Sequence, residues 1–327
     1  MSSINTNASA MTALQTLSAT NKALNTTQGR IATGLRVAEA SDNAAYWSIA
    51  TTMRSDNKAL STVQDSLGLG ASKVDTAYTG MNKAIDTLNE IKVKLVAANG
   101  ASNADKAKIQ TEVKALQDQL KAYADGATFS GTNMLSVNSG AAVAADVKVV
   151  SAFNRDASGT ASISTIDIKV EGIKLYEAGA GVATTGKGIL DSERTAAGVE
   201  GAANAVTLGT YDAADTFQVA TMKLTDGTLF ANDQQLSQML GVVESALKDM
   251  NTAATDLGAA KSRIELQKTF TASLMDSIDR GVGQLVDADM NKESTRLQAL
   301  QVQQQLGIQA LSIANGNSQS IMSLFRG

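Results

Sequence analysis

Apolar residues recur every seven positions along the first third of the chain. The series contains Tyr46, Met53, Leu60, Leu67, Val74, Met81, Leu88 and Leu95. A seven-residue repeat sustained over this length keeps one stripe of a helix facing one partner, which is typical of coiled coils. The pattern therefore predicts a helix over 44–99, with Asp42 as its N-cap and Gly100 as its end.

The same repeat predicts shorter helical segments near 10–35 and 109–123, and a long one over 236–285. Apolar stripes continue from there towards the end of the chain. The first and last helical blocks each need a partner to cover their stripes, and the simplest arrangement is that they pack on each other. We therefore expect a set of subunit-packing residues drawn from both ends. The set is Leu14, Leu17, Leu24, Ile31, Leu35, Leu297, Leu300, Leu306, Leu311, Leu324 and Phe325.

A region of different character lies between the helical blocks, at 137–232. It holds 11 of the 26 glycines. Alternating or β-branched runs at 147–153, 163–170 and 217–224 predict strands, and Asp226-Gly227 is a hairpin-type turn signal. We expect a small β-containing domain here, with a loop over 179–188.

The composition removes much of the usual catalytic chemistry. The 327 residues include no His, no Cys and no Pro. His is the side chain that titrates near neutral pH, and His and Cys are the common zinc ligands. We therefore expect no enzyme, no metal site and no cofactor. A segment at 181–188 comes within one residue of a phosphate-binding loop, but Gly188 stands where that motif needs Ser or Thr to hold Mg²⁺.

Charge and hydropathy restrict the partners. The net charge of −4 disfavours a nucleic-acid partner, because phosphate binding requires clustered Lys and Arg. No apolar run reaches the roughly 18 residues that a membrane span requires. The first 15 residues have neither a basic segment nor an apolar one, so no Sec signal peptide is expected.

The two ends of the chain are uncharged. Residues 1–21 and 297–325 contain no Asp, Glu, Lys or Arg, and Gln supplies much of the polarity in the second stretch. Ordinary surface helices carry charges for solubility. Their absence suits a helix that many copies of one chain bring close together, because like charges would then repeat against themselves.

Several segments make the chain similar to the bacterial flagellins, the protomers of flagellar filaments. They are RIATGLRV at 30–37, ASDNAA at 40–45, TFSGTNML at 128–135, LGAAKSRI at 257–264 and DADMNKE at 287–293. The stretch that starts at Asp42 and continues through Tyr46, Trp47 and Ala50 most resembles members of the α-proteobacterial, rhizobial type.

The resemblance implies a domain organisation for the predicted mainly α fold. Residues 1–43 and 285–327 would form an inner helical domain that lines a channel. Residues 44–136 and 233–284 would form a long antiparallel coiled-coil or helical-hairpin stalk, built from both termini. Residues 137–232 would be the small, variable, β-rich inserted outer domain.

The resemblance also implies function, location and partners. We expect a structural protomer that polymerises with itself, and with other flagellins, into an extracellular filament of the bacterial flagellum. An export chaperone, the flagellar type III export apparatus and a filament cap are the further partners that the family implies. Two alternatives remain, a hook–filament junction protein and a secreted coiled-coil adhesin. Self-polymerisation distinguishes a flagellin from these alternatives, because a flagellin should extend a filament indefinitely and a junction protein should not.

Overall fold

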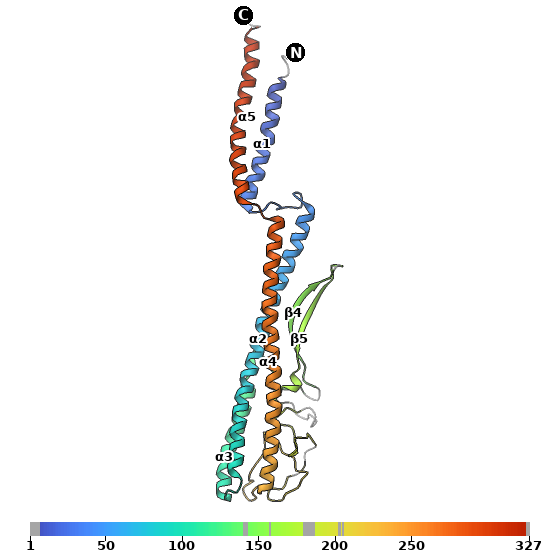
Figure 1. The fold of residues 1–327 in the computed structure, drawn as a ribbon, viewed down its shortest axis with the longest axis vertical. Coiled ribbons are helices and arrows are strands. Elements are labelled where there is room, and N and C mark those ends of the chain that lie inside the picture. Colours follow the sequence, from blue (N-terminus) through green and yellow to red (C-terminus); the bar gives the residue numbers. More distant parts are fainter. Residues whose placement is uncertain are drawn as a thin grey trace. The chain divides into compact units, whose positions relative to one another are not determined.

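The computed structural model describes residues 7–139, 143–156, 158–178, 187–201, 204 and 206–324, with 317–324 described by their backbone only. The chain divides into two compact units, one of 1–59 with 274–327 and one of 60–273. The helices are α1 (Ala8–Thr33), α2 (Ala44–Ala98), α3 (Asn103–Gly126), α4 (Asp233–Val286) and α5 (Met290–Leu324) (Figure 1). The mainly α fold with a small strand-containing middle region is confirmed.

Strands occupy only short parts of the middle region. β1 (Thr128–Phe129) pairs with β2 (Thr132–Asn133), and β3 (Ser136–Val137) runs parallel to β6 (Tyr176–Glu177). The longest pair is the antiparallel hairpin of β4 (Val147–Arg155) and β5 (Ala161–Ile168), followed by the 3-10 helix η1 (Val170–Gly172). The strand predicted at 147–153 therefore lies within β4. The strand predicted at 163–170 lies within β5 except for residues 169 and 170, which follow the end of β5.

The core of the 60–273 unit follows the predicted seven-residue repeat. From Leu60 to Leu95 every member of the α2 series is buried. On α4 one series of buried apolar positions alternates by three and four residues. It contains Leu236, Met239, Val243, Ala246, Met250, Ala253, Leu257, Ala260 and Ile264. In Figure 1 α2 and α4 run side by side in opposite directions, and their stripes belong to one continuous core.

The start of α2 differs from the prediction in two ways. The N-cap is Asn43, whose Oδ1 accepts a hydrogen bond from the Tyr46 N–H at 3.1 Å. Asp42 is not the cap, because its carboxylate turns back and accepts bonds from the backbone N–H groups of Ala38 and Glu39. Tyr46 is the first residue of the apolar series, but its side chain is exposed. The seven-residue repeat therefore begins in the sequence before the helix becomes buried.

The strand predicted at 217–224 is wrong. Apart from one isolated bridge at Phe217, this segment forms turns and irregular structure. Glutamines of α3 satisfy its backbone instead of a neighbouring strand. The Gln117 amide donates to the carbonyls of Val219 and Met222, at 2.8 and 3.0 Å, and the Leu224 N–H donates to Gln110. Apolar side chains in the segment are buried because it packs on helices.

Two predictions concern turns of the middle region. The Asp226-Gly227 turn is confirmed, since Asp226 Oδ1 accepts from the N–H groups of Thr228 and Leu229 and a bridge joins Thr225 to Phe230. The loop predicted over 179–188 lies outside the described residues, apart from 187 and 188.

The β4–β5 hairpin packs closely against a glycine of α2. A Cβ built on Gly70 would lie 2.4 Å from Cγ1 and 2.7 Å from Cγ2 of Val149. Val149 is β-branched and therefore stiff, so it cannot move aside cheaply. The hairpin approaches α2 this closely because position 70 has no side chain.

Replacing Gly70 should detach or displace this hairpin. We expect Gly70→Ala to lower the free energy of unfolding, because overpacking of about 1–3 kcal/mol exceeds the gain in helix propensity. The matched control is Gly68→Ala on the same helix, where an added Cβ meets nothing within 4 Å. That change should stabilise the protein by roughly 0.5–1 kcal/mol. Urea unfolding of both variants measures the difference. Equal free energies of unfolding for Gly70→Ala and Gly68→Ala would contradict close packing of the hairpin on Gly70.

Candidate assembly surface

Helices α1 and α5 form an antiparallel pair with a regular seam in the unit of 1–59 and 274–327. A series of buried or half-buried positions again alternates by three and four residues. On α1 this series is Ala10, Ala13, Leu17, Thr20, Leu24, Thr27 and Ile31, with Asn21, Ala23 and Arg30 half-buried beside it, and on α5 it is Glu293, Leu297, Leu300, Gln304, Gly307, Leu311 and Ala314. This spacing packs the side chains of one helix between those of the other. The predicted pairing of the first and last helical blocks is present within one chain.

Polar contacts fix the alignment of α1 against α5. At one end the Asn7 amide donates to the Ala314 carbonyl at 2.9 Å, and midway the Gln304 amide donates to Asn21 Oδ1 at 2.7 Å. At the other end Arg30 Nη1 lies 3.3 Å from Oε1 of Glu293, which is only 7% exposed. Sliding one helix by a turn would break all three contacts, so they define a single alignment of a seam that is otherwise apolar.

The linker between α1 and α2 is hydrogen-bonded to the linker between α4 and α5, next to the end of the seam that contains Arg30 and Glu293. The Arg36 N–H donates to the Val286 carbonyl at 2.7 Å, and the Ala288 N–H donates to the Gly34 carbonyl at 2.9 Å. The Arg36 guanidinium adds a bond to the Leu285 carbonyl at 2.9 Å. Gly34 has a φ of 72°, a left-handed conformation that ends α1 and that Gly adopts most readily. The linkers therefore form one hydrogen-bonded junction.

A small apolar cluster supports the junction. Its buried members are Val37, Ala50, Val282 and Val286, and its partly buried members are Leu35, Met53, Ile278 and Leu285. The cluster contains residues from α2, from α4 and from one linker, so the junction is packed as well as hydrogen-bonded.

Asp42 closes the loop that precedes α2. Its Oδ2 accepts from the N–H groups of Ala38 at 3.0 Å and Glu39 at 3.2 Å. These bonds favour the charged carboxylate and hold the pKa of Asp42 below its usual value, with a smaller contribution from Arg30.

The faces of α1 and α5 outside the seam carry exposed apolar side chains. On α1, Met11 and Leu14 line a shallow groove with small polar neighbours such as Gln15 and Ser18. On α5, after Met290 at its start, the exposed large apolar residues among those described are Val302, Leu306, Ile308 and Ile313. Most surface helices cover such positions with charged side chains, but 297–325 contain none. Each helix thus presents a second, uncovered apolar face.

The structure divides the sequence-predicted packing residues into four groups. Leu17, Leu24, Ile31, Leu297, Leu300 and Leu311 lie in the seam. Leu35 lies in the linker cluster. Leu14 is 57% exposed and Leu306 is 58% exposed, so both lie largely outside the seam of the described helices, contrary to the expectation that they meet across it. The physical reason is geometric, because the seam admits one stripe of each helix and these two residues lie off it. For Leu324 only the backbone is described, and Phe325 lies outside the described residues.

The sequence reasoning missed the polar alignment contacts and the linker junction. The segments 30–37 and 287–293 are the signal that could have found the junction, since they carry the family resemblance yet interrupt the apolar repeat.

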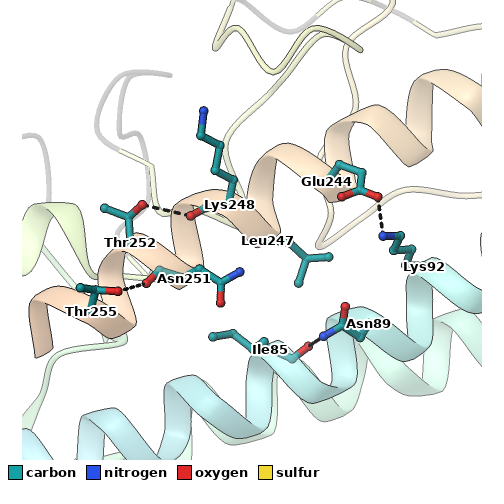
Figure 2. Close-up of a pocket in the computed structure, with 9 residues that line it drawn as sticks. All are labelled: Ile85, Asn89, Lys92, Glu244, Leu247, Lys248, Asn251, Thr252 and Thr255. Carbon is teal, nitrogen blue, oxygen red and sulfur yellow. Dashed lines mark hydrogen bonds and ion pairs between the residues drawn. The ribbon is translucent and has the colours of Figure 1, made fainter. Parts of the chain in front are cut away.

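A polar pocket lies between α2 and α4 in the other unit (Figure 2). The Lys92 ammonium and the Glu244 carboxylate pair across one end of it. Three further polar side chains bond to backbone carbonyls of their own helices, the Asn89 amide to Ile85, the Thr252 hydroxyl to Lys248 and the Thr255 hydroxyl to Asn251. Figure 2 shows both threonine hydroxyls bonded to backbone carbonyls of α4. The Lys92–Glu244 ion pair joins α2 to α4 at this pocket.

Within the described ranges, no group of acidic side chains is placed to hold a metal ion. Among the described helices, none combines the length and apolar character of a membrane span.

Comparisons with known proteins agree with this architecture. Residues 4–140 match the family model described as the bacterial flagellin N-terminal helical region, and residues 240–325 match the bacterial flagellin C-terminal helical region. The chain is 47% identical to a flagellin of Brucella melitensis biotype 1 over 327 residues and 49% identical to flagellin C of Rhizobium meliloti (strain 1021) over 329. It is 44% identical to flagellin A of the latter strain over 403 residues. Each alignment covers 100% of both chains.

Truncating a seam leucine should destabilise the α1–α5 pair, whereas truncating an exposed one should not. Leu24 is 8% exposed, so Leu24→Ala should lower the free energy of unfolding of this pair by roughly 2 kcal/mol. Leu14→Ala, on the same helix, should change it by less than about 0.5 kcal/mol. Helical circular dichroism during urea titration of the monomer measures both. A larger loss from Leu14→Ala than from Leu24→Ala would refute the assigned seam.

The Asp42 carboxyl should titrate below the ordinary Asp value of about 3.9. Because its folded-state pKa is lowered, the loop gains stability above the unfolded-state pKa and loses it as the pH falls through the folded-state pKa. Carbon NMR of the Asp42 carboxyl against pH gives the midpoint, and the urea-unfolded protein is the control. A midpoint equal to that of the unfolded chain would show that the bonds from Ala38 and Glu39 do not form in solution.

Proposed function

This chain belongs to the bacterial flagellin family, and we propose that the exposed apolar faces of α1 and α5 are the surfaces through which its subunits pack on one another. It is a structural protomer of the extracellular flagellar filament and polymerises with itself. The hook–filament junction protein and the adhesin are not favoured. The observation that carries the proposal is the second apolar stripe on helices whose first stripe is already buried within the chain.

The energetics support this role for the outer faces. Burial of apolar surface contributes about 25 cal/mol per Å². The large apolar side chains over half exposed in the described parts of α5 and α1 are Val302, Leu306, Ile308, Ile313, Met11 and Leu14. In a polymer the gain from covering them is repeated in every subunit. The lack of charge over 297–325 allows copies to approach without repulsion or the desolvation of ions.

We extend the proposal to the domain organisation. Residues 1–43 and 285–327 would form the inner layer that lines a channel, 44–136 and 233–284 the stalk around it, and 137–232 the outward insert. Support comes from the position of the linker junction. Its two segments, Gly34 to Val37 and Val286 to Ala288, lie close to the two positions where the proposed inner layer gives way to the stalk. The full predicted packing set, Leu324 and Phe325 included, remains part of this proposal.

We also propose the remaining partners and the absence of catalysis. The subunit would be exported by the flagellar export apparatus with a chaperone, added beneath a filament cap, and able to co-assemble with other flagellins. It would have no enzymatic role and no cofactor, for which the support is a sequence without His or Cys.

Charge placed on an outer face should block polymerisation and spare the monomer. We expect Leu306→Lys to abolish extension of filament seeds by purified protein, because a buried unpaired ammonium would recur in every subunit. The control is Leu229→Lys, since Leu229 is 44% exposed in the middle region and its side chain lies outside both terminal helices. Negative-stain microscopy measures filament length, and circular dichroism checks that both monomers fold.

Three outcomes distinguish the possibilities. Extension by the wild type and by Leu229→Lys alone supports the assigned surface. Normal extension by Leu306→Lys would remove α5 from the subunit interface. Failure of the wild type to extend seeds would return the junction protein to consideration.

A further inference from the structure

The chain contains two Asn-Gly dipeptides, Asn99-Gly100 and Asn315-Gly316, in different backbone settings. Asn99 and Gly100 form the turn between α2 and α3, whereas Asn315 and Gly316 lie inside α5. All four residues are exposed. The pair therefore compares the same dipeptide, at similar exposure, in a turn and in a helix.

Asn-Gly sequences can rearrange without an enzyme. The backbone nitrogen of the Gly attacks the side-chain Cγ of the Asn, a C–N bond forms, the Cγ–Nδ2 bond breaks, and ammonia leaves with the proton from the Gly nitrogen. The product is a five-membered cyclic imide. Water then opens one of its two C–N bonds, which gives either Asp or an isoaspartyl linkage whose backbone is longer by one methylene group. No oxidant or reductant takes part.

The turn at Asn99 opposes this reaction less than a helix would. Gly100 has a φ of 73°, and an added Cβ would meet nothing within 4 Å. Its nitrogen donates a long hydrogen bond, 3.3 Å to the exposed carboxylate of Asp233, and attack on the Asn99 side chain breaks this bond without breaking a helix. The backbone here is not committed to a helical hydrogen-bond ladder. α2 ends at Ala98, and the Asn99 N–H donates to the Val96 carbonyl in a final tight turn.

The helix around Asn315 opposes the reaction. Ring closure requires the Asn Cβ and the following nitrogen to become nearly eclipsed about the Cα–C bond. A helical ψ near −42° keeps them apart. Rotation into the reactive geometry would therefore break helical hydrogen bonds on both sides of Asn315. Reaction at this site requires local opening of α5.

We propose that Asn99 is a site of spontaneous deamidation and isoaspartate formation in the folded subunit, and that Asn315 is protected. The inference does not rest on the assembly surface. It gives the α2–α3 turn a chemical change that accumulates with the age of the protein.

The modification would act on a contact that joins the turn to α4. The Gly100 N–H donates to Oδ1 of Asp233, the first residue of α4, at 3.3 Å. Lys106 holds the same carboxylate at 3.5 Å and donates to the Ala231 carbonyl at 2.9 Å. The imide nitrogen carries no hydrogen, so the bond from Gly100 is lost when the ring forms. Ring opening then leaves a new carboxylate in the same turn, which repels Asp233.

Peptide mapping by mass spectrometry tests the proposal on the full-length protein. Folded protein is incubated at mildly alkaline pH, which accelerates the reaction. Samples taken at intervals are digested with trypsin at only slightly acidic pH, where the rearrangement is slow and trypsin still cleaves. We expect a gain of one mass unit, with a split chromatographic peak for the two isomers, in the peptide that contains Asn99. The peptide that contains Asn315 should stay largely unchanged. Fragment ions separate Asn99 from Asn103, which shares its tryptic peptide.

Two controls make the result decisive. Asn99→Gln lengthens the side chain and disfavours the five-membered ring, so the mass gain at this peptide should disappear. In protein unfolded by urea the two Asn-Gly sites should react at similar rates, since both then lack structure. Equal rates at Asn99 and Asn315 in the folded protein, or faster reaction at Asn315, would overturn the proposal. So would an unmodified Asn99 in samples whose unfolded control reacts.

Discussion

Each terminal helix of this protein carries more apolar surface than the chain can bury on its own. An antiparallel pair of helices covers one stripe of each, and α1 and α5 use that stripe for the seam that contains Leu24 and Leu300. Side chains outside that stripe, such as Leu14 and Leu306, remain exposed to water. This exposure is unfavourable, and residues 1–21 and 297–325 carry no charged side chain that would offset it. Association with further copies is therefore favoured.

The apolar stripes alone do not define a unique alignment, since a helix pair of this kind can slide by one repeat. A few polar groups supply what the leucines lack. Arg30 with Glu293, Asn21 with Gln304, and the bonds between the two linkers each join the start of the chain to its end. A defined alignment matters for a polymer, because an error in one subunit would be transmitted to the surface offered to the next.

The sequence predicted the long helices well, since the seven-residue repeat directly reports which face is buried. It could not predict which of two apolar stripes the chain would use, and so it placed Leu14 and Leu306 in the same set as Leu17 and Leu300. It also could not separate a strand from an apolar segment packed on a helix. Residues 217–224 have a strand-like composition, but Gln117 and Gln110 satisfy their backbone from α3. When side chains from a distant helix replace the hydrogen bonds of a neighbouring strand, the sequence of the segment itself contains no sign of it.

The absence of Cys from the sequence permits a direct test of the central claim, that the outer faces are covered by other subunits. A single cysteine is introduced by Ile313→Cys, at a position 66% exposed in the subunit, and another protein carries Leu229→Cys in the middle region. The rate of reaction with a water-soluble thiol reagent is measured for monomers and for filaments. We predict that both cysteines react in monomers and that only the one at position 229 reacts in filaments. Undiminished reaction at position 313 in filaments would contradict the account.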